Sequence, residues 1–117
     1  MVFLVPQFVH GQVTKDEWIE ELHLCENRDN VEKILDTNGK YSYGELMFQL
    51  DTFHNFGKQY GIIPDDFTKE ESLLLISNKH VQRAIAKEML DDGLWRHWYN
   101  CAVKITKKVG SYPQLSS

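Results

Sequence analysis

Hydrophobic residues recur at helical spacing from the first third of the chain onward. The first such stretch follows TKDE (14–17), a capping box in which Thr14 caps a helix and the Glu17 side chain returns to the cap amide. The apolar residues that then share one helical face are Trp18, Ile19, Leu22 and Cys25. We expect this helix to end near Cys25 or Glu26, because ENRDN (26–30) is rich in turn-forming residues.

A β-hairpin is predicted directly after this helix. Asn38-Gly39 is a strong hairpin signal, since both residues tolerate the positive φ of a type I′ turn. The flanking segments EKILDT and KYSYG supply two short strands. With a two-residue loop, Asp36 would lie opposite Tyr41, and Ile34 would lie opposite Tyr43.

Helical patterns return after the hairpin. One helix is predicted from Glu45 to about Tyr60, with inward-facing Leu46, Leu50, Phe53 and Phe56. Thr68 and Glu71 form a second capping box before SLLLIS. Ser77 or Asn78 caps a helix through Met89 and Leu90, Gly93 ends it, and a last helix contains HWYNCAVKITKKV (97–109). The sequence predicts a mainly α (α+β) domain spanning 1–117, with an N-terminal extension (1–13) and a C-terminal tail (111–117).

Composition and charge exclude several classes of protein. A chain of 117 residues with 42% hydrophobic residues forms one domain with one core. All 17 acidic residues lie before residue 93, and no broad basic patch points to nucleic acid. The apolar start MVFLVPQFVHGQV has no basic segment before it and is too short to span a membrane, so it is no convincing signal peptide.

The two cysteines, Cys25 and Cys101, show no metal-binding spacing, and we expect neither a metal nor another cofactor. Two readings of the cysteines stay open. They form one disulfide in an exported protein, or both are reduced and buried.

The order of these motifs resembles the lysozyme-like superfamily, in particular its soluble lytic transglycosylase-like domains. Glu26-Asn27, at the end of a helix, stands where the family often has Glu-Ser. NGKYSYGELMFQ (38–49) resembles the family hairpin with its Gly-Leu-Met-Gln type motif, and GLWRHWYNC (93–101) resembles an aromatic segment that often carries Tyr-Asn. Two positions depart from the pattern: Glu45 replaces a small or apolar residue, and Met47 stands at the glutamine position, with Gln49 two residues on.

A second pattern resembles phage-type lysozymes, which show a glutamate, an aspartate about nine residues later and a threonine six further. Here Glu26, Asp36 and Ser42 lie ten and six residues apart. A lysozyme-like fold would also pack the helices of Cys25 and Cys101 together around the cleft, close enough for a disulfide.

The resemblance implies a peptidoglycan-cleaving glycosidase, a lytic transglycosylase or a muramidase, acting on the β-1,4 bond between N-acetylmuramic acid and N-acetylglucosamine. Glu26 would be the general acid/base and Asp36 the second carboxylate, because glycoside cleavage needs a carboxyl group that stays protonated near neutral pH. The substrate-binding candidates are Ser42, Tyr43, Gln49, Trp98, Tyr99 and Asn100.

The resemblance also implies a monomer that binds peptidoglycan glycan strands and works in an extracellular, periplasmic or phage-associated setting. The alternative is a catalytically inactive lysozyme-fold module that binds a glycan or a protein.

Overall fold

The computed structural model describes residues 13–114 of the chain. This part is mainly helical, with one small antiparallel sheet in the order β1-β2-β3. The predicted mainly α (α+β) class is therefore confirmed. The helices are α1 (Lys15–Glu26), α2 (Leu50–Gln59), α3 (Lys69–Leu75), α4 (Lys79–Asp91), the 3-10 helix η2 (Trp95–Trp98) and α5 (Tyr99–Val109). The strands are β1 (Lys33–Leu35), β2 (Tyr41–Tyr43) and β3 (Phe48–Gln49).

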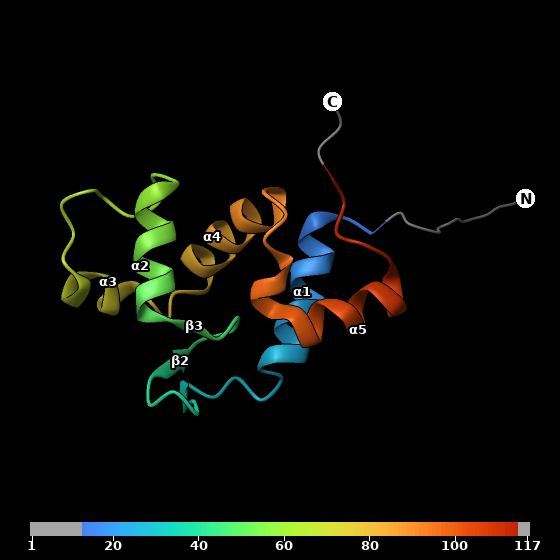
Figure 1. The fold of residues 1–117 in the computed structure, drawn as a ribbon, viewed down its shortest axis with the longest axis horizontal. Coiled ribbons are helices and arrows are strands. Elements are labelled where there is room, and N and C mark those ends of the chain that lie inside the picture. The colour runs from blue at the N-terminus through green and yellow to red at the C-terminus, as the bar shows by residue number, and fades with distance from the viewer. Residues whose placement is uncertain (1–12, 115–117) are drawn as a thin grey trace, which may run out of the picture.

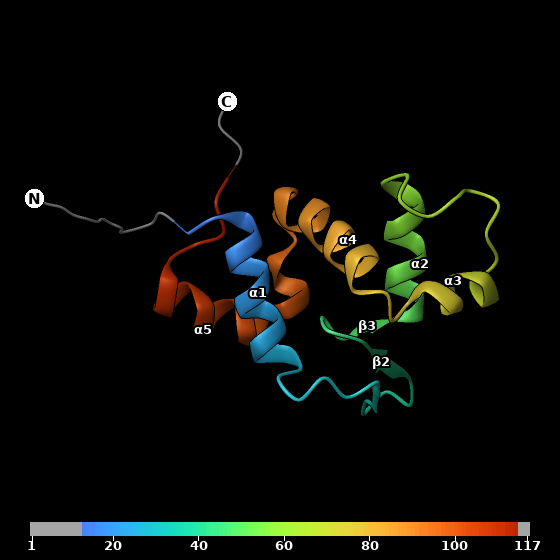
Figure 2. The ribbon, with the colours of Figure 1, turned by 180° about the vertical axis from the view of Figure 1, so that it is seen from behind.

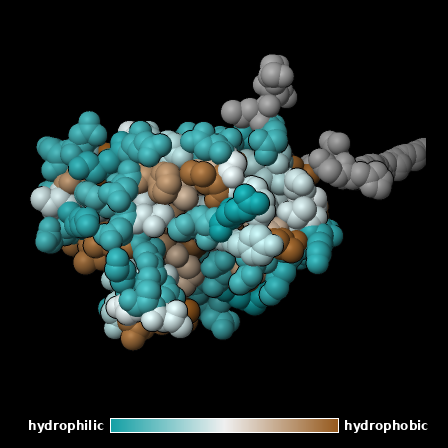
Figure 3. Space-filling model, in the orientation of Figure 1, coloured by the Kyte–Doolittle hydropathy of each residue, from teal (hydrophilic) through white to brown (hydrophobic). Residues whose placement is uncertain are grey.

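The helices form two groups joined by α4. Figures 1 and 2 show α1 and α5 side by side at one end, α2 with α3 at the other, and α4 between them. The sheet lies along one edge of this arrangement, near the C-terminal end of α1. Hydrophilic side chains cover most of the face shown in Figure 3. In the described part of the chain, no helix has the length and apolar character needed to cross a membrane.

The predicted helix caps are confirmed. At α1, the Glu17 amide donates to Thr14 Oγ1 (3.0 Å) and the Thr14 amide donates to Glu17 Oε1 (2.8 Å). Thr68 and Glu71 repeat this arrangement at α3, and Asn78 caps α4. The α4 helix ends at Asp91, and Gly93 (φ +78°) follows its C-cap residue Asp92, with the Gly93 amide donating to the Leu90 carbonyl. These signals are local, so the sequence suffices to read them.

The predicted type I′ turn and its register are wrong. Gly39 (φ +82°) is the one residue of the turn with a positive φ, and its amide donates to the Asp36 carbonyl (3.0 Å). The Asp36 amide donates to the Lys40 carbonyl (2.8 Å), which gives a three-residue loop: a type I turn with a glycine bulge. Ile34 therefore pairs with Ser42 rather than with Tyr43. Asn-Gly fits either turn, and the extra loop residue shifts the register by one.

The prediction of a helix beginning at Glu45 is also wrong. Residues 44–47 form a turn, β3 follows, and α2 begins only at Leu50. Leu46 is nevertheless fully buried, so the apolar pattern identified an inward residue but not its backbone conformation.

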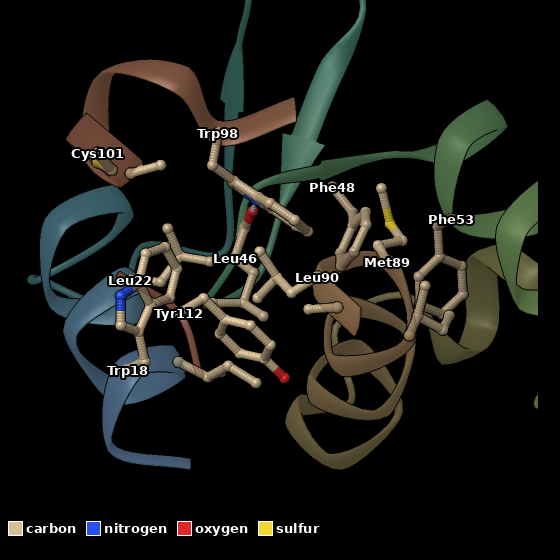
Figure 4. Packing of buried hydrophobic residues seen from close by; sticks show 14 of the residues in the cluster. Trp18, Leu22, Leu46, Phe48, Phe53, Met89, Leu90, Trp98, Cys101 and Tyr112 are labelled. Atoms are coloured by element: carbon tan, nitrogen blue, oxygen red, sulfur yellow. Dashed lines mark hydrogen bonds between the residues drawn. The ribbon is translucent and has the colours of Figure 1, made fainter. Parts of the chain in front are cut away.

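The core lies where α1, α4, α5 and the segment 46–53 meet, as Figure 4 shows. Its largest buried side chains include Trp18, Phe48, Phe53 and Trp98. Tyr112 closes one end, with its ring edge against Trp18 at a centroid distance of 5.5 Å. The expected tail from residue 111 therefore begins inside the packed part of the chain, while the expected extension lies, except for Val13, outside the described residues.

A disulfide joins Cys25 in the last turn of α1 to Cys101 in the first turn of α5, with Cα atoms 5.8 Å apart. The predicted proximity of the two cysteines is confirmed. The bond fixes the end of α1, and with it Glu26, against the segment that carries Trp98.

Candidate active site

An open cleft of about 390 Å³ lies between the end of α1, the sheet and η2. Its walls come from segments far apart in the sequence, and the residues that line it are Glu26, Ile34, Asp36, Ser42, Met47, Gln49, Thr52, His97 and Trp98.

The sheet presents one face to this cleft. Ile34 pairs with Ser42 and Ser42 pairs with Gln49, so these three residues lie in one row across the strands. Neighbouring residues of a strand point to opposite faces, which directs Leu35 and Tyr41 to the other side. The observed register, one residue away from the predicted one, thus places Ser42 in the cleft.

Asp36 is held by two side chains of this row. Ser42 Oγ donates a hydrogen bond to Asp36 Oδ2, and Gln49 Nε2 donates to the same oxygen (2.8 Å). Gln49 is itself tied to Asn38 of the turn by hydrogen bonds of 3.1 and 3.2 Å. The bonds from Ser42 and Gln49 lower the pKa of the Asp36 carboxyl, because they stabilise its charged form. Asp36 is therefore an oriented carboxylate at neutral pH.

Glu26 has the opposite environment. It is the last residue of α1 and half-buried, and burial raises the pKa of its carboxyl. The negative charge of Asp36 raises this pKa further. Among the described residues, no hydrogen bond to the Glu26 carboxyl offsets these two effects on its pKa. The two carboxyl groups of this cleft are thus shifted in opposite directions, Glu26 toward its protonated form and Asp36 toward its ionised form.

Aromatic rings form the opposite wall. The Trp98 indole is almost fully buried, and its Nε1 donates to the Leu46 carbonyl (2.9 Å). The His97 ring stacks on Phe48 at a centroid distance of 5.8 Å, and desolvation lowers the pKa of its imidazole. The hydrogen bond to Leu46 therefore fixes the Trp98 indole in this wall, beside the exposed residue His97.

The cleft brings together five residues that the sequence singled out: Glu26, Asp36, Ser42, Gln49 and Trp98. The other three substrate-binding candidates do not line it: Tyr43, Tyr99 and Asn100. Tyr43 lies on the opposite face of the sheet from Ser42, and Tyr99 is 54% exposed with its ring stacked on Trp95.

Four lining residues were not predicted: Ile34, Met47, Thr52 and His97. The alternation within β1 could have identified Ile34 once the register was known. For Met47, no sequence signal predicts its left-handed backbone (φ +55°).

Glu45, whose departure from the family pattern was noted, lies outside the cleft. Arg83 Nε donates to its carboxylate (2.8 Å), and His23 Nδ1 lies 3.7 Å away. Its side chain belongs to an ion-pair cluster that joins the turn to α1 and α4.

Comparisons with protein-family models, with curated proteins and with solved structures gave no match for this chain.

Proposed function

We propose that the protein is a glycosidase with a lysozyme-like fold that cleaves the β-1,4 bond between N-acetylmuramic acid and N-acetylglucosamine in peptidoglycan. The observation that carries this proposal is the pair of carboxyl groups in one open cleft, with the pKa of Glu26 raised and that of Asp36 lowered. Two carboxyl groups whose environments separate their pKa values are the arrangement that glycoside cleavage uses.

In this mechanism Glu26 donates its proton to the glycosidic oxygen as the bond to the sugar breaks. The Asp36 carboxylate stabilises the positive charge that builds on the ring, or orients the water that attacks it. Glu26 then takes the proton back from that water. Lytic transglycosylation needs only one such acid, so the hydrogen bonds that orient Asp36 favour hydrolysis.

The choice of substrate rests on the motif resemblance and on the lining of the cleft. Ser42, Gln49 and Thr52 offer hydroxyl and amide groups of the kind that bind sugar hydroxyls and N-acetyl groups. The cleft is open rather than closed, as a polymeric glycan strand requires. The disulfide between Cys25 and Cys101 supports action in an oxidising setting outside the cytosol.

The test is the hydrolysis of purified peptidoglycan by wild type and by Glu26→Gln, which keeps the shape of the side chain but has no transferable proton. Loss of general acid catalysis should lower turnover by about 100-fold or more. The matched control is Glu32→Gln, an exposed carboxylate outside the cleft, which should keep wild-type activity.

A folded Glu26→Gln protein with wild-type turnover would remove Glu26 from the mechanism. A wild-type protein that binds peptidoglycan but never cleaves it would identify the inactive binding module instead.

A further inference from the structure

The turn at residues 44–47 joins β2 to β3, and so lies between Ser42 and Gln49 in the sequence, and its last residue, Met47, lines the cleft. Gly44 (φ +73°) and Met47 (φ +55°) both have left-handed backbone conformations. A non-glycine residue in this region is strained and persists only where its surroundings hold it. Contacts from outside the sheet must hold this turn, because β2 ends before it and β3 begins only at Phe48.

One buried side chain of α4 binds the turn on both sides of Gly44. Gln82 is fully buried, and its Oε1 accepts a hydrogen bond from the Leu46 amide (2.8 Å). Its Nε2 donates to the carbonyls of Tyr43 (2.7 Å) and Ile76 (2.6 Å). A glutamine amide has two N–H donors, so both are used and the buried group is satisfied.

The turn is fitted closely to this amide. A Cβ atom built on Gly44 would lie 2.5 Å from Gln82 Nε2, far inside any real contact. Glycine is therefore required at this position for two reasons, its positive φ and the approach of Gln82.

The geometry points to Gln82 as a positioning residue for the candidate active site, although its side chain does not reach the cleft. Tyr43 follows Ser42 directly, and Leu46 lies three residues before Gln49. By binding the Tyr43 carbonyl and the Leu46 amide, Gln82 supports the pairing of β2 with β3 that sets Ser42 beside Gln49, the two donors that hold Asp36. The claim about Asp36 needs no catalysis, while its effect on turnover rests on the proposed function.

The test variant is Gln82→Met, in which the side chain keeps about the length and volume of glutamine but loses all three hydrogen bonds. It is compared with a matched control. Ser72→Ala removes a different fully buried hydrogen bond, between Ser72 Oγ and His54 Nδ1 (2.7 Å), which joins α3 to α2 away from the cleft. Both variants lose stability, so all measurements are made well below both melting temperatures.

The first readout is the pKa of the Asp36 carboxyl, followed by NMR of its side-chain carbon. We expect this pKa to rise toward the usual aspartate value in Gln82→Met and to stay unchanged in Ser72→Ala. The second readout is turnover, where displaced catalytic groups should lower kcat by about 10- to 100-fold in Gln82→Met alone. If Gln82→Met does not fold, Gly44→Ala disturbs the same contact from the side of the turn and should move the Asp36 pKa in the same direction.

A folded Gln82→Met or Gly44→Ala protein with the wild-type Asp36 pKa overturns the inference, as does an equal shift in Ser72→Ala. A shift confined to the two variants at the turn supports the inference even where the wild-type protein cleaves no glycan. That absence of cleavage would overturn the proposed function alone.

Discussion

Reducing the disulfide between Cys25 and Cys101 should destabilise the protein strongly. The bond closes a loop with a sequence separation of 76, which restricts the unfolded chain far more than the folded one. The loop-entropy relation gives about 4.5 kcal/mol at 25 °C for this length, and measured disulfides typically contribute about 2–4 kcal/mol. We therefore expect the free energy of unfolding to fall by about 2–4.5 kcal/mol on reduction.

The assay is urea denaturation of the oxidised and the reduced protein, which share one composition and differ only in this bond. The double variant Cys25→Ala/Cys101→Ala should behave like the reduced protein, apart from the small loss of packing at two sulfur atoms. The m-value, the slope of the unfolding free energy against urea concentration, should also increase, because an unlinked chain exposes more surface when it unfolds.

The same bond fixes the C-terminal end of α1 against η2 and α5, so reduction should lower turnover under conditions where the protein stays folded. Two free thiols in the denatured, unreduced protein would exclude the bond. An unchanged denaturation midpoint after complete reduction would refute the entropic reasoning.

The remaining predictions concern the turn and the two carboxyl groups. Gly39→Val should lower the free energy of unfolding by about 1–2 kcal/mol and should also lower turnover. Gly39 has φ +82°, and no described atom beyond its chain neighbours lies within 4 Å of an added Cβ, so this loss comes from backbone strain rather than from a steric clash. The control is Gly61→Val, at φ +72° and equally unobstructed, which should lower the melting temperature by a similar amount and leave turnover unchanged. Equal losses of activity in the two variants would contradict the account. The raised pKa of Glu26 favours folding below the carboxyl's unfolded pKa, and this contribution disappears as pH rises through the folded pKa. Glu26→Gln should therefore be more stable than wild type at neutral pH, and Asp36→Asn, which loses a carboxyl with a lowered pKa, should be less stable there. The difference in stability between Asp36→Asn and wild type should vanish as pH falls through the folded pKa of Asp36. Melting curves from pH 3 to 7 measure both differences, and stability differences of the opposite sign would contradict both pKa assignments.

The features that the sequence predicted well depend on nearby residues. Thr14 with Glu17, Thr68 with Glu71 and Asn78 cap their helices through contacts within one turn, so their spacing alone identifies them. The position of Glu26 at the end of α1 followed from the turn-rich segment after it.

The features that the sequence did not predict depend on distant partners. The turn at 44–47 is held by Gln82 from α4, by the Trp98 indole and by Asn27, whose Nδ2 donates to the Gly44 carbonyl (2.8 Å). None of these partners lies within 15 residues of the turn along the sequence, so the helical spacing of Leu46 and Leu50 was misread as one helix.

The predicted cleft residues likewise include some that line the cleft and some that do not. Ser42 and Gln49 line the cleft because alternation within strands places them on one face. Tyr99, one residue after Trp98, does not line it, because its ring stacks on Trp95 and is 54% exposed.

The central claim, a glycosidase built on Glu26 and Asp36, is tested most directly by mass spectrometry of the products from purified peptidoglycan in ¹⁸O-labelled water. The account predicts muropeptides with a reducing N-acetylmuramic acid end that carries the label, and almost none from Glu26→Gln. Products one water lighter, with a 1,6-anhydro end and no label, would show transglycosylation and remove Asp36 from its role with water. Intact peptidoglycan after incubation with folded wild-type protein would contradict the account.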